Sequence, residues 1–176
     1  MTPASTTRLT TRRLRLRRWR LDDFEPLATF VGDAELALYR TGAPLDRTAA
    51  WFFMCAQLGQ WDARGYGIFA VTLAASDDPI GYTGLYHPIM FDEPELSWSL
   101  FRGHHGQGYA TEMATAVIGW AAADLRLPAL MSYVHPDNQS SRRVADRLGA
   151  RIEGEASYMG APRLVYRHRL PADAVA

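Results

Sequence analysis

The sequence predicts one α/β domain in which helices cover the faces of a mixed sheet. Its 176 residues are the usual size of one domain, so we treat residues 1–176 as a unit with a core from about residue 10 to residue 170. A hydrophobic content of 48% and a charged content of 22% are typical of a globular protein. Segments with strand-like and helix-like periodicity also follow one another along the chain without a repeat or a linker.

The first third of the chain predicts a strand and two helices. Residues 14–19 alternate apolar and charged side chains, which is typical of a half-buried strand with a solvated arginine face. Residues 22–31 begin with two aspartates and continue as a helix, since acidic residues suit the positive end of the helix dipole. A second helix is expected over about residues 46–62, with most of its aromatic residues and the single cysteine, Cys55, in the core.

The middle of the chain predicts a meander of three neighbouring strands. Residues 66–73 and 80–87 are strand-like, and the turn-forming residues 76–79 lie between them. Residues 95–100 then alternate once more between apolar and polar side chains.

The last part of the chain returns to helix and strand in turn. Apolar residues recur on one helical face over residues 108–125. The remaining predicted elements are a strand at 130–134, a helix at 138–148 closed by Gly149, and strands at 152–158 and 164–170.

The charged residues exclude several classes of function. All 19 basic residues are arginine, so a Walker phosphate-loop lysine, a pyridoxal Schiff base and a lysine general base are impossible. The formal net charge is zero, which argues against a nucleic-acid binder, although seven arginines within residues 8–20 leave a local anion patch open. The longest apolar stretch, residues 116–123, is too short to span a bilayer, and there is no apolar signal core. We expect a cytoplasmic protein without a membrane partner.

Residues 102–112, read as Arg-Gly-His-His-Gly-Gln-Gly-Tyr-Ala-Thr-Glu, predict an anion site between a strand and a helix. Glycines let consecutive backbone N–H groups converge, and the helix start adds unpaired donors, so a phosphate can bind there without lysine. A dinucleotide fingerprint would need a third glycine at position 111 and an early βαβ unit. Position 111 is threonine and lies past mid-chain.

Three segments resemble one known family. Residues 105–110 resemble the Q/R-x-x-G-x-G/A turn of the GNAT superfamily of acetyl-CoA-dependent N-acetyltransferases, with His105 in place of Gln or Arg. The extension to residue 112 is similar to the Rim-type branch, which acetylates ribosomal-protein N-termini. Residues 11–17 and 138–149 resemble that branch's opening strand and its Asn-x-x-Ser…Leu-Gly helix, although Ala150 replaces a common aromatic residue. The resemblance covers about residues 10–170.

The resemblance implies a GNAT-like fold and a cofactor site. The fold would have a mixed, mostly antiparallel sheet of about seven strands, about four flanking helices, and strands splayed around acetyl-CoA. Asn138 would bind the pantetheine amide. The other implied cofactor-binding residues are Ser99, Leu100 and Phe101 through their backbone, His105, Gly106, Gln107, Gly108, Tyr109, Ala110 and Thr111 in the turn, and Ser141.

Acetyl transfer to an amine needs a general base and a proton donor for the departing thiolate. The resemblance implies Glu95 as the base, because it lies on the strand before the turn, and Ser141 as the acid. Tyr133 or Tyr158 could be the acid instead. Glu112 is expected to be a helix-dipole partner or a structural residue. Arg102, Arg142 and Arg143 are possible phosphate partners or solvated surface residues.

Several alternatives stay open at this stage. The acceptor is a primary amine, such as a protein N-terminus, or a small amine such as a polyamine, an antibiotic or an amino-acid derivative. A non-catalytic acyl-CoA-binding module and an arginine-face nucleic-acid binder are the other hypotheses. Trp51 or Tyr158 could contribute to acceptor recognition. We expect no metal, because His104 and His105 are adjacent and would point in opposite directions on an extended backbone. We expect a monomer or a homodimer.

Overall fold

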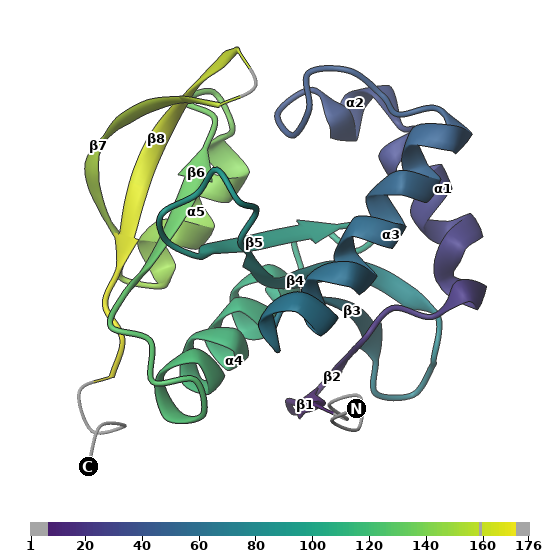
Figure 1. The fold of residues 1–176 in the computed structure, drawn as a ribbon, viewed down its shortest axis with the longest axis horizontal. Coiled ribbons are helices and arrows are strands. Elements are labelled where there is room, and N and C mark those ends of the chain that lie inside the picture. Colours follow the sequence, from purple (N-terminus) through teal and green to yellow (C-terminus); the bar gives the residue numbers. More distant parts are fainter. Residues whose placement is uncertain (1–6, 159, 172–176) are drawn as a thin grey trace.

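The computed structural model describes residues 7–158 and 160–171, and their central element is an eight-stranded sheet (Figure 1). Its spatial order is β1-β2-β3-β4-β5-β6-β8-β7. The strands are β1 Leu9–Thr10, β2 Leu14–Arg17, β3 Ile68–Leu73, β4 Pro79–Tyr86, β5 Glu95–Leu100, β6 Leu130–Val134, β7 Arg151–Tyr158 and β8 Ala161–His168. All neighbouring pairs are antiparallel except β5 and β6, which are parallel.

Helices cover both faces of this sheet. α4 packs on one face through Met113, Val117 and Trp120, and α1 and α3 pack on the other around Leu27 and Met54. The helices of the described residues are α1 Phe24–Val31, α2 Ala34–Ala37, α3 Arg47–Arg64, α4 Tyr109–Ala123 and α5 Gln139–Arg147, with a 3₁₀ turn at Leu21–Asp23 before α1. The predicted α/β fold with a mixed, mostly antiparallel sheet is confirmed. β1 and α2 were not predicted, because two and four residues are too few to show a period.

The predicted solvated arginine face of the first strand is wrong at Arg17. Arg15 is exposed, but Arg17 is buried, and its Nη1 and Nη2 donate to the two carboxylate oxygens of Asp23 at 2.7 and 2.8 Å. This bidentate pair joins β2 to the turn before α1. A buried charge needs such a partner, and the alternating pattern alone could not reveal it.

The prediction that Cys55 is a core residue is also wrong. The buried positions of α3 are Ala50, Met54, Gln57 and Trp61, which recur at helical spacing on one face. Cys55 lies on another face and is exposed, and so is Phe52, at 66%. The apolar composition around the cysteine indicated a core, but the helical period decides which residues face it.

The pairing of β5 and β6 positions the functional site. β5 pairs with β4 along its whole length, from Glu95 to Leu100. It pairs with β6 only between Glu95 and Met131, so the two parallel strands diverge beyond that point. The expected splaying of neighbouring strands therefore lies between β5 and β6. In the part of the chain that the structure describes, no helix is long and apolar enough to cross a membrane.

Candidate functional site

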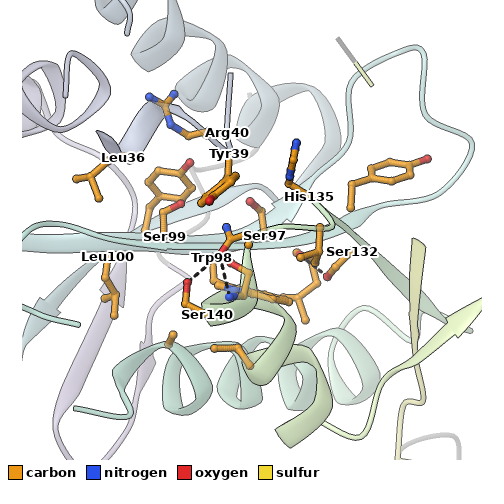
Figure 2. A pocket seen from close by; sticks show the side chains of 18 of the residues that line it. Leu36, Tyr39, Arg40, Ser97, Trp98, Ser99, Leu100, Ser132, His135 and Ser140 are labelled. Atoms are coloured by element: carbon orange, nitrogen blue, oxygen red, sulfur yellow. Dashed lines mark hydrogen bonds between the residues drawn. The ribbon is translucent and has the colours of Figure 1, made fainter. Parts of the chain in front are cut away.

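A cavity of about 900 Å³ occupies the gap between β5 and β6 (Figure 2). This volume lies in the range of ligand-binding pockets. Much of the lining comes from the loop after α2, strands β4 and β5, the glycine turn with the start of α4, the end of β6 with α5, and the β7–β8 hairpin. Helices α1, α2 and α3 and strand β3 contribute further residues. The predicted site residues in this lining are Glu95, Ser99, Leu100, His105, Gly106, Gly108, Ala110, Thr111, Asn138 and Ser141.

The glycine turn has the backbone geometry that an anion site needs. Gly106 and Gly108 have φ angles of +76° and +79°, in the left-handed region that side chains rarely adopt. Gly108 is the N-cap of α4 and provides no capping side chain, so the first backbone N–H groups of the helix lack acceptors within it. The Thr111 hydroxyl, in that first turn, is buried without a hydrogen-bond partner. These donors fit a phosphate group.

The outer side of the turn is held by the N-terminal strands. Arg13 donates to the carbonyl of Gln107 at 3.0 Å, and its guanidinium lies 4.5 Å from the Tyr109 ring centre. Glu112 accepts hydrogen bonds from Thr11 Oγ1 at 2.5 Å and from Arg13 Nε at 2.6 Å. Burial alone would raise the pKa of Glu112, but these hydrogen bonds lower it below its ordinary value. Glu112 is a structural residue, as expected, whereas the predicted site residues Gln107 and Tyr109 lie outside the cavity lining.

One edge of β5 faces the gap. The carbonyl of Leu96 accepts a hydrogen bond from Ser132 Oγ on β6 at 2.6 Å, and that of Leu100 accepts one from His105 Nε2 at 2.9 Å. Because backbone groups of alternate residues point to the same strand edge, those of Trp98 face the gap as well. Trp98 was missed in the sequence, since the alternation shows the period but not which residues face which neighbouring strand.

The opposite edge of β5 is paired with β4. Phe101 donates its N–H to the carbonyl of Ile80 at 2.8 Å, and its ring stacks on Phe30 with a centroid distance of 4.7 Å. Ser99 pairs with Tyr82 of β4, so by the same alternation its backbone groups also face β4. The backbone of neither residue faces the gap, contrary to the prediction, although Ser99 lines the cavity and Phe101 does not. The side chain of Ser99 points to the same side of the strand as Tyr39 (Figure 2).

The start of α5 forms the wall opposite the β5 edge. The Asn138 side chain accepts from the Ser141 backbone N–H at 3.1 Å and from Ser140 Oγ at 2.7 Å, so it caps the helix. Asn138 and Ser141 nevertheless both line the cavity, so capping and cofactor contact are compatible. Arg143 and Arg147 line it too, one helical turn apart.

The other candidate phosphate partners are occupied elsewhere. Arg102 forms ion pairs with Asp33 and with Glu35, the latter at 2.9 Å. Arg142 Nη1 donates to the carbonyl of Pro136 at 3.2 Å. Neither arginine lines the cavity, which leaves Arg143 as the member of the predicted set that does.

Glu95 lies at the point where β5 and β6 separate. Its Oε1 accepts the backbone N–H of Tyr133 at 3.3 Å. Burial raises the pKa of Glu95 to about 7, while this hydrogen bond and the charge of Arg163 oppose the shift. A carboxyl group with such a pKa can accept a proton at neutral pH.

Two tyrosines lie beside this carboxylate. Tyr133 and Tyr158 both line the cavity, and their rings are stacked with centroids 6.1 Å apart. Burial raises the pKa of Tyr158, so its hydroxyl stays protonated and can act as a donor. Tyr133 and Tyr158 therefore both stay possible as the acid, beside Ser141.

The remaining lining residues form an end of the cavity that the sequence did not reveal. Trp51, an expected recognition residue, instead packs edge-on against Phe24 at a centroid distance of 5.4 Å. No short motif marks the residues found there, because they come from separate segments. Among them are Tyr39, Arg40, Tyr82, Tyr86, His135 and Arg163. Among the described residues, no group of three or more His, Cys, Asp or Glu is placed to hold a metal ion.

Known proteins are similar to this chain in sequence and in fold. The acetyltransferase (GNAT) domain family matches residues 13–151. The crystal structure of an acetyltransferase from Agrobacterium tumefaciens strain C58 is 36% identical, covers 94% of this chain and 95% of that one, and has a TM-score of 0.85. The uncharacterized N-acetyltransferase p20 of Bacillus licheniformis is 26% identical over 151 residues, 83% of each chain.

A more distant structure shares the fold. RimL, a ribosomal L7/L12 alpha-N-protein acetyltransferase, is 15% identical, covers 93% of this chain and 94% of that one, and has a TM-score of 0.79. Together with the splayed strands and the glycine turn, the family match over most of the chain identifies the protein. It belongs to the GNAT acetyltransferase family and is an acetyl-CoA-dependent N-acetyltransferase.

Proposed function

We propose that the chain transfers an acetyl group from acetyl-CoA to a primary amine by direct attack in a ternary complex, with Glu95 as general base. A protein N-terminal amine is the proposed acceptor. The observation that carries the proposal is the continuity of the cavity: Glu95, the free edge of β5 and the glycine turn line one space. An amine beside Glu95 would therefore lie in the same space as a thioester held along β5.

The cavity residues fit acetyl-CoA, which supplies an activated acetyl thioester. The glycine turn and the start of α4 would hold the pyrophosphate through backbone N–H groups and the unpartnered Thr111 hydroxyl. The backbone of Trp98 and the side chain of Asn138 would hold the pantetheine arm from opposite walls. A backbone N–H of β5 would stabilise negative charge on the carbonyl oxygen.

The chain's own side chains would move two protons. The carboxylate of Glu95 accepts a proton from the ammonium form of the amine, directly or through water, which frees the nitrogen lone pair. The new N–C bond forms as the C–S bond breaks. A hydroxyl of the chain then protonates the departing sulfur and is restored by the second proton that the nitrogen loses as the amide forms, with Ser141 as the proposed donor and Tyr133 or Tyr158 as the alternatives.

A thiol-release assay with acetyl-CoA tests the proposal against a panel of peptide N-termini and small amines. Replacing Glu95 by glutamine should lower kcat/KM about 10²- to 10⁴-fold, which is the usual contribution of a general base. Glu155→Gln is the matched control, because Glu155 is exposed on β7 outside the cavity. An unchanged rate in Glu95→Gln would remove this residue as the base. Acetylation of small amines alone would exclude the protein N-terminus as the acceptor. If no amine were acetylated, the result would favour a non-catalytic acyl-CoA-binding module.

The thermal stability of Glu95→Gln shows whether such a loss reflects chemistry or misfolding. Because burial raises the pKa of Glu95 to about 7, the native carboxylate costs stability as pH rises from the ordinary carboxyl pKa to 7, and this cost is fully present above pH 7. Glutamine removes the charge and keeps the oxygen that accepts the Tyr133 N–H. The Tm at pH 8 should therefore stay equal or rise.

A further inference from the structure

Two arginines at the acceptor end of the cavity form no direct ion pair among the described residues, although Glu95 lies near enough to Arg163 for their charges to interact. Arg163, on β8, is only 4% exposed, and its Nη1 and Nη2 donate to the carbonyls of Pro162 at 3.0 Å and Arg40 at 3.3 Å. Arg40, in the loop after α2, donates from Nη2 to the carbonyl of Val31 at 3.0 Å, and its guanidinium lies over the Phe30 ring at 5.3 Å. Its Nε and Nη1 are buried without a hydrogen-bond partner. Within residues 7–158 and 160–171, no carboxylate forms an ion pair with either arginine.

Both arginines face the same space as the proposed base. Each lines the cavity that Glu95 lines. The guanidinium of Arg40 lies on the same side of β5 as the side chain of Ser99 (Figure 2). The hydrogen bond from Arg163 to the Arg40 carbonyl joins the β7–β8 hairpin to the loop after α2, so the Arg163 guanidinium lies beside the Arg40 backbone.

The charges of the lining favour an anionic ligand over a polycation. Among the described lining residues the acids are Glu35 and Glu95, and Glu35 is already paired with Arg102 at 2.9 Å. Four arginines line the same cavity, and Arg143 and Arg147 of the four lie on α5, on the phosphate side. The acceptor end therefore combines two arginines with one available carboxylate. A buried guanidinium with unused donors is costly, and a carboxylate satisfies it with two parallel hydrogen bonds.

We propose that Arg40 and Arg163 form a carboxylate subsite, so that the enzyme acetylates an amine that carries an acidic group close to it. The carboxylate would come from the α-carboxylate of an amino-acid-like acceptor or from an acidic side chain next to a peptide N-terminus. This inference rests on the proposed function, because it takes the Glu95 end of the cavity as the acceptor end. It disfavours polyamines and polycationic antibiotics as acceptors.

Matched acid and amide acceptors test the subsite. Glycine against glycinamide probes the α-carboxylate, and a peptide beginning Ala-Asp against one beginning Ala-Asn probes a side-chain carboxylate. The acid of at least one pair should have a kcat/KM about 10- to 100-fold above that of its amide, as expected for hydrogen bonds to a charged group. Equal values in both pairs would overturn the proposal.

Arginine variants show whether the subsite causes the preference. Arg40→Gln should bring the acid-to-amide ratio of kcat/KM close to one. Arg163→Gln should lower this ratio too. If that variant fails to fold, Arg163→Lys keeps the buried charge in place and should still lower the ratio. Arg15→Gln, at an exposed position on β2, should leave the ratio unchanged. A ratio that survives in both Arg40→Gln and Arg163→Lys would assign the preference to other residues and overturn the proposal.

Calorimetry separates the subsite from the proposed function. Glycine, glycinamide and the two peptides are titrated into the protein saturated with coenzyme A, which carries no acetyl group and allows no turnover. Tighter binding of the acids than of the amides, lost in Arg40→Gln, would support the subsite. This holds even if no amine is acetylated, a result that would contradict the proposed function alone. Acetylation with equal binding of acid and amide would leave the function in place and overturn the subsite.

Discussion

The two ends of the cavity are built in different ways. At the end that we propose for the cofactor, the candidate contacts are backbone groups: glycines with positive φ, the uncapped start of α4 and the free edge of β5. At the acceptor end they come from side chains, namely Glu95, several tyrosines and two arginines. A backbone site depends on local conformation and tolerates many side-chain changes, whereas a side-chain site can change its ligand by single substitutions. The difference predicts a conserved ligand at one end and an adaptable one at the other.

Removal of the hydroxyl that we propose as the proton donor to the sulfur, that of Ser141, should have a large effect. Ser141→Ala should lower kcat about 10²-fold, the lower range for a general acid, with little change in the KM for either substrate. Tyr158→Phe is the comparison, measured under saturating conditions. A large loss in Tyr158→Phe with full activity in Ser141→Ala would assign the acid to the tyrosine and to the acceptor end.

A backbone change should affect only the cofactor end. Gly108→Ala places a side chain at φ +79°, which costs about 1–2 kcal/mol, so the turn relaxes and the KM for acetyl-CoA rises about tenfold. Gly119→Ala is the matched control, because Gly119 is an exposed residue inside α4 with no atom within 4 Å of an added Cβ. It should stabilise the protein by about 0.5–1 kcal/mol and leave the KM unchanged. Equal KM values for both variants would contradict a backbone-built phosphate site.

A smaller effect on cofactor affinity is expected from the hydroxyl of Thr111, which is buried in the first turn of α4 without a hydrogen-bond partner. Thr111→Val removes a buried donor that has no protein partner, so the unliganded protein should be as stable as before or more stable. Its affinity for coenzyme A, measured by calorimetry, should fall about fivefold, which corresponds to one hydrogen bond of about 1 kcal/mol. A loss of stability without a loss of affinity would show that the hydroxyl serves packing.

The same contrast explains what the sequence could predict. The cofactor end lies in short continuous segments, so the turn at residues 105–111 and the helix beginning at Asn138 could be recognised and were placed together by the structure. The side-chain direction of Tyr109 could not be predicted, because its ring packs against the guanidinium of Arg13, about a hundred residues away. The Gln107 side chain donates to the carbonyl of Gly103 at 3.1 Å instead of facing the cavity.

The acceptor end could hardly be predicted at all. It joins Arg40, Tyr82 and Arg163 from separate segments. The sheet order places the strands of Tyr82 and Arg163, and packing of the loop after α2 places Arg40. Glu95 was recognised because a family resemblance implied it, not because its own strand distinguished it from the other glutamates of the sequence. The elements themselves were predicted well where a period extended over five residues or more, as at β6.

The pH dependence of kcat/KM for the acceptor, compared between wild type and Glu95→Gln, tests the central claim most directly. The base must be deprotonated to take a proton from the ammonium, and its pKa is about 7, so for an acceptor with a higher amine pKa the wild-type rate should be level just above pH 7 and fall tenfold per pH unit below it. Glu95→Gln can use only amine that is already neutral in solution, so its rate should rise with pH up to the amine pKa without a break near pH 7. A break near pH 7 in both proteins would contradict the assignment of Glu95 as the group that takes the proton.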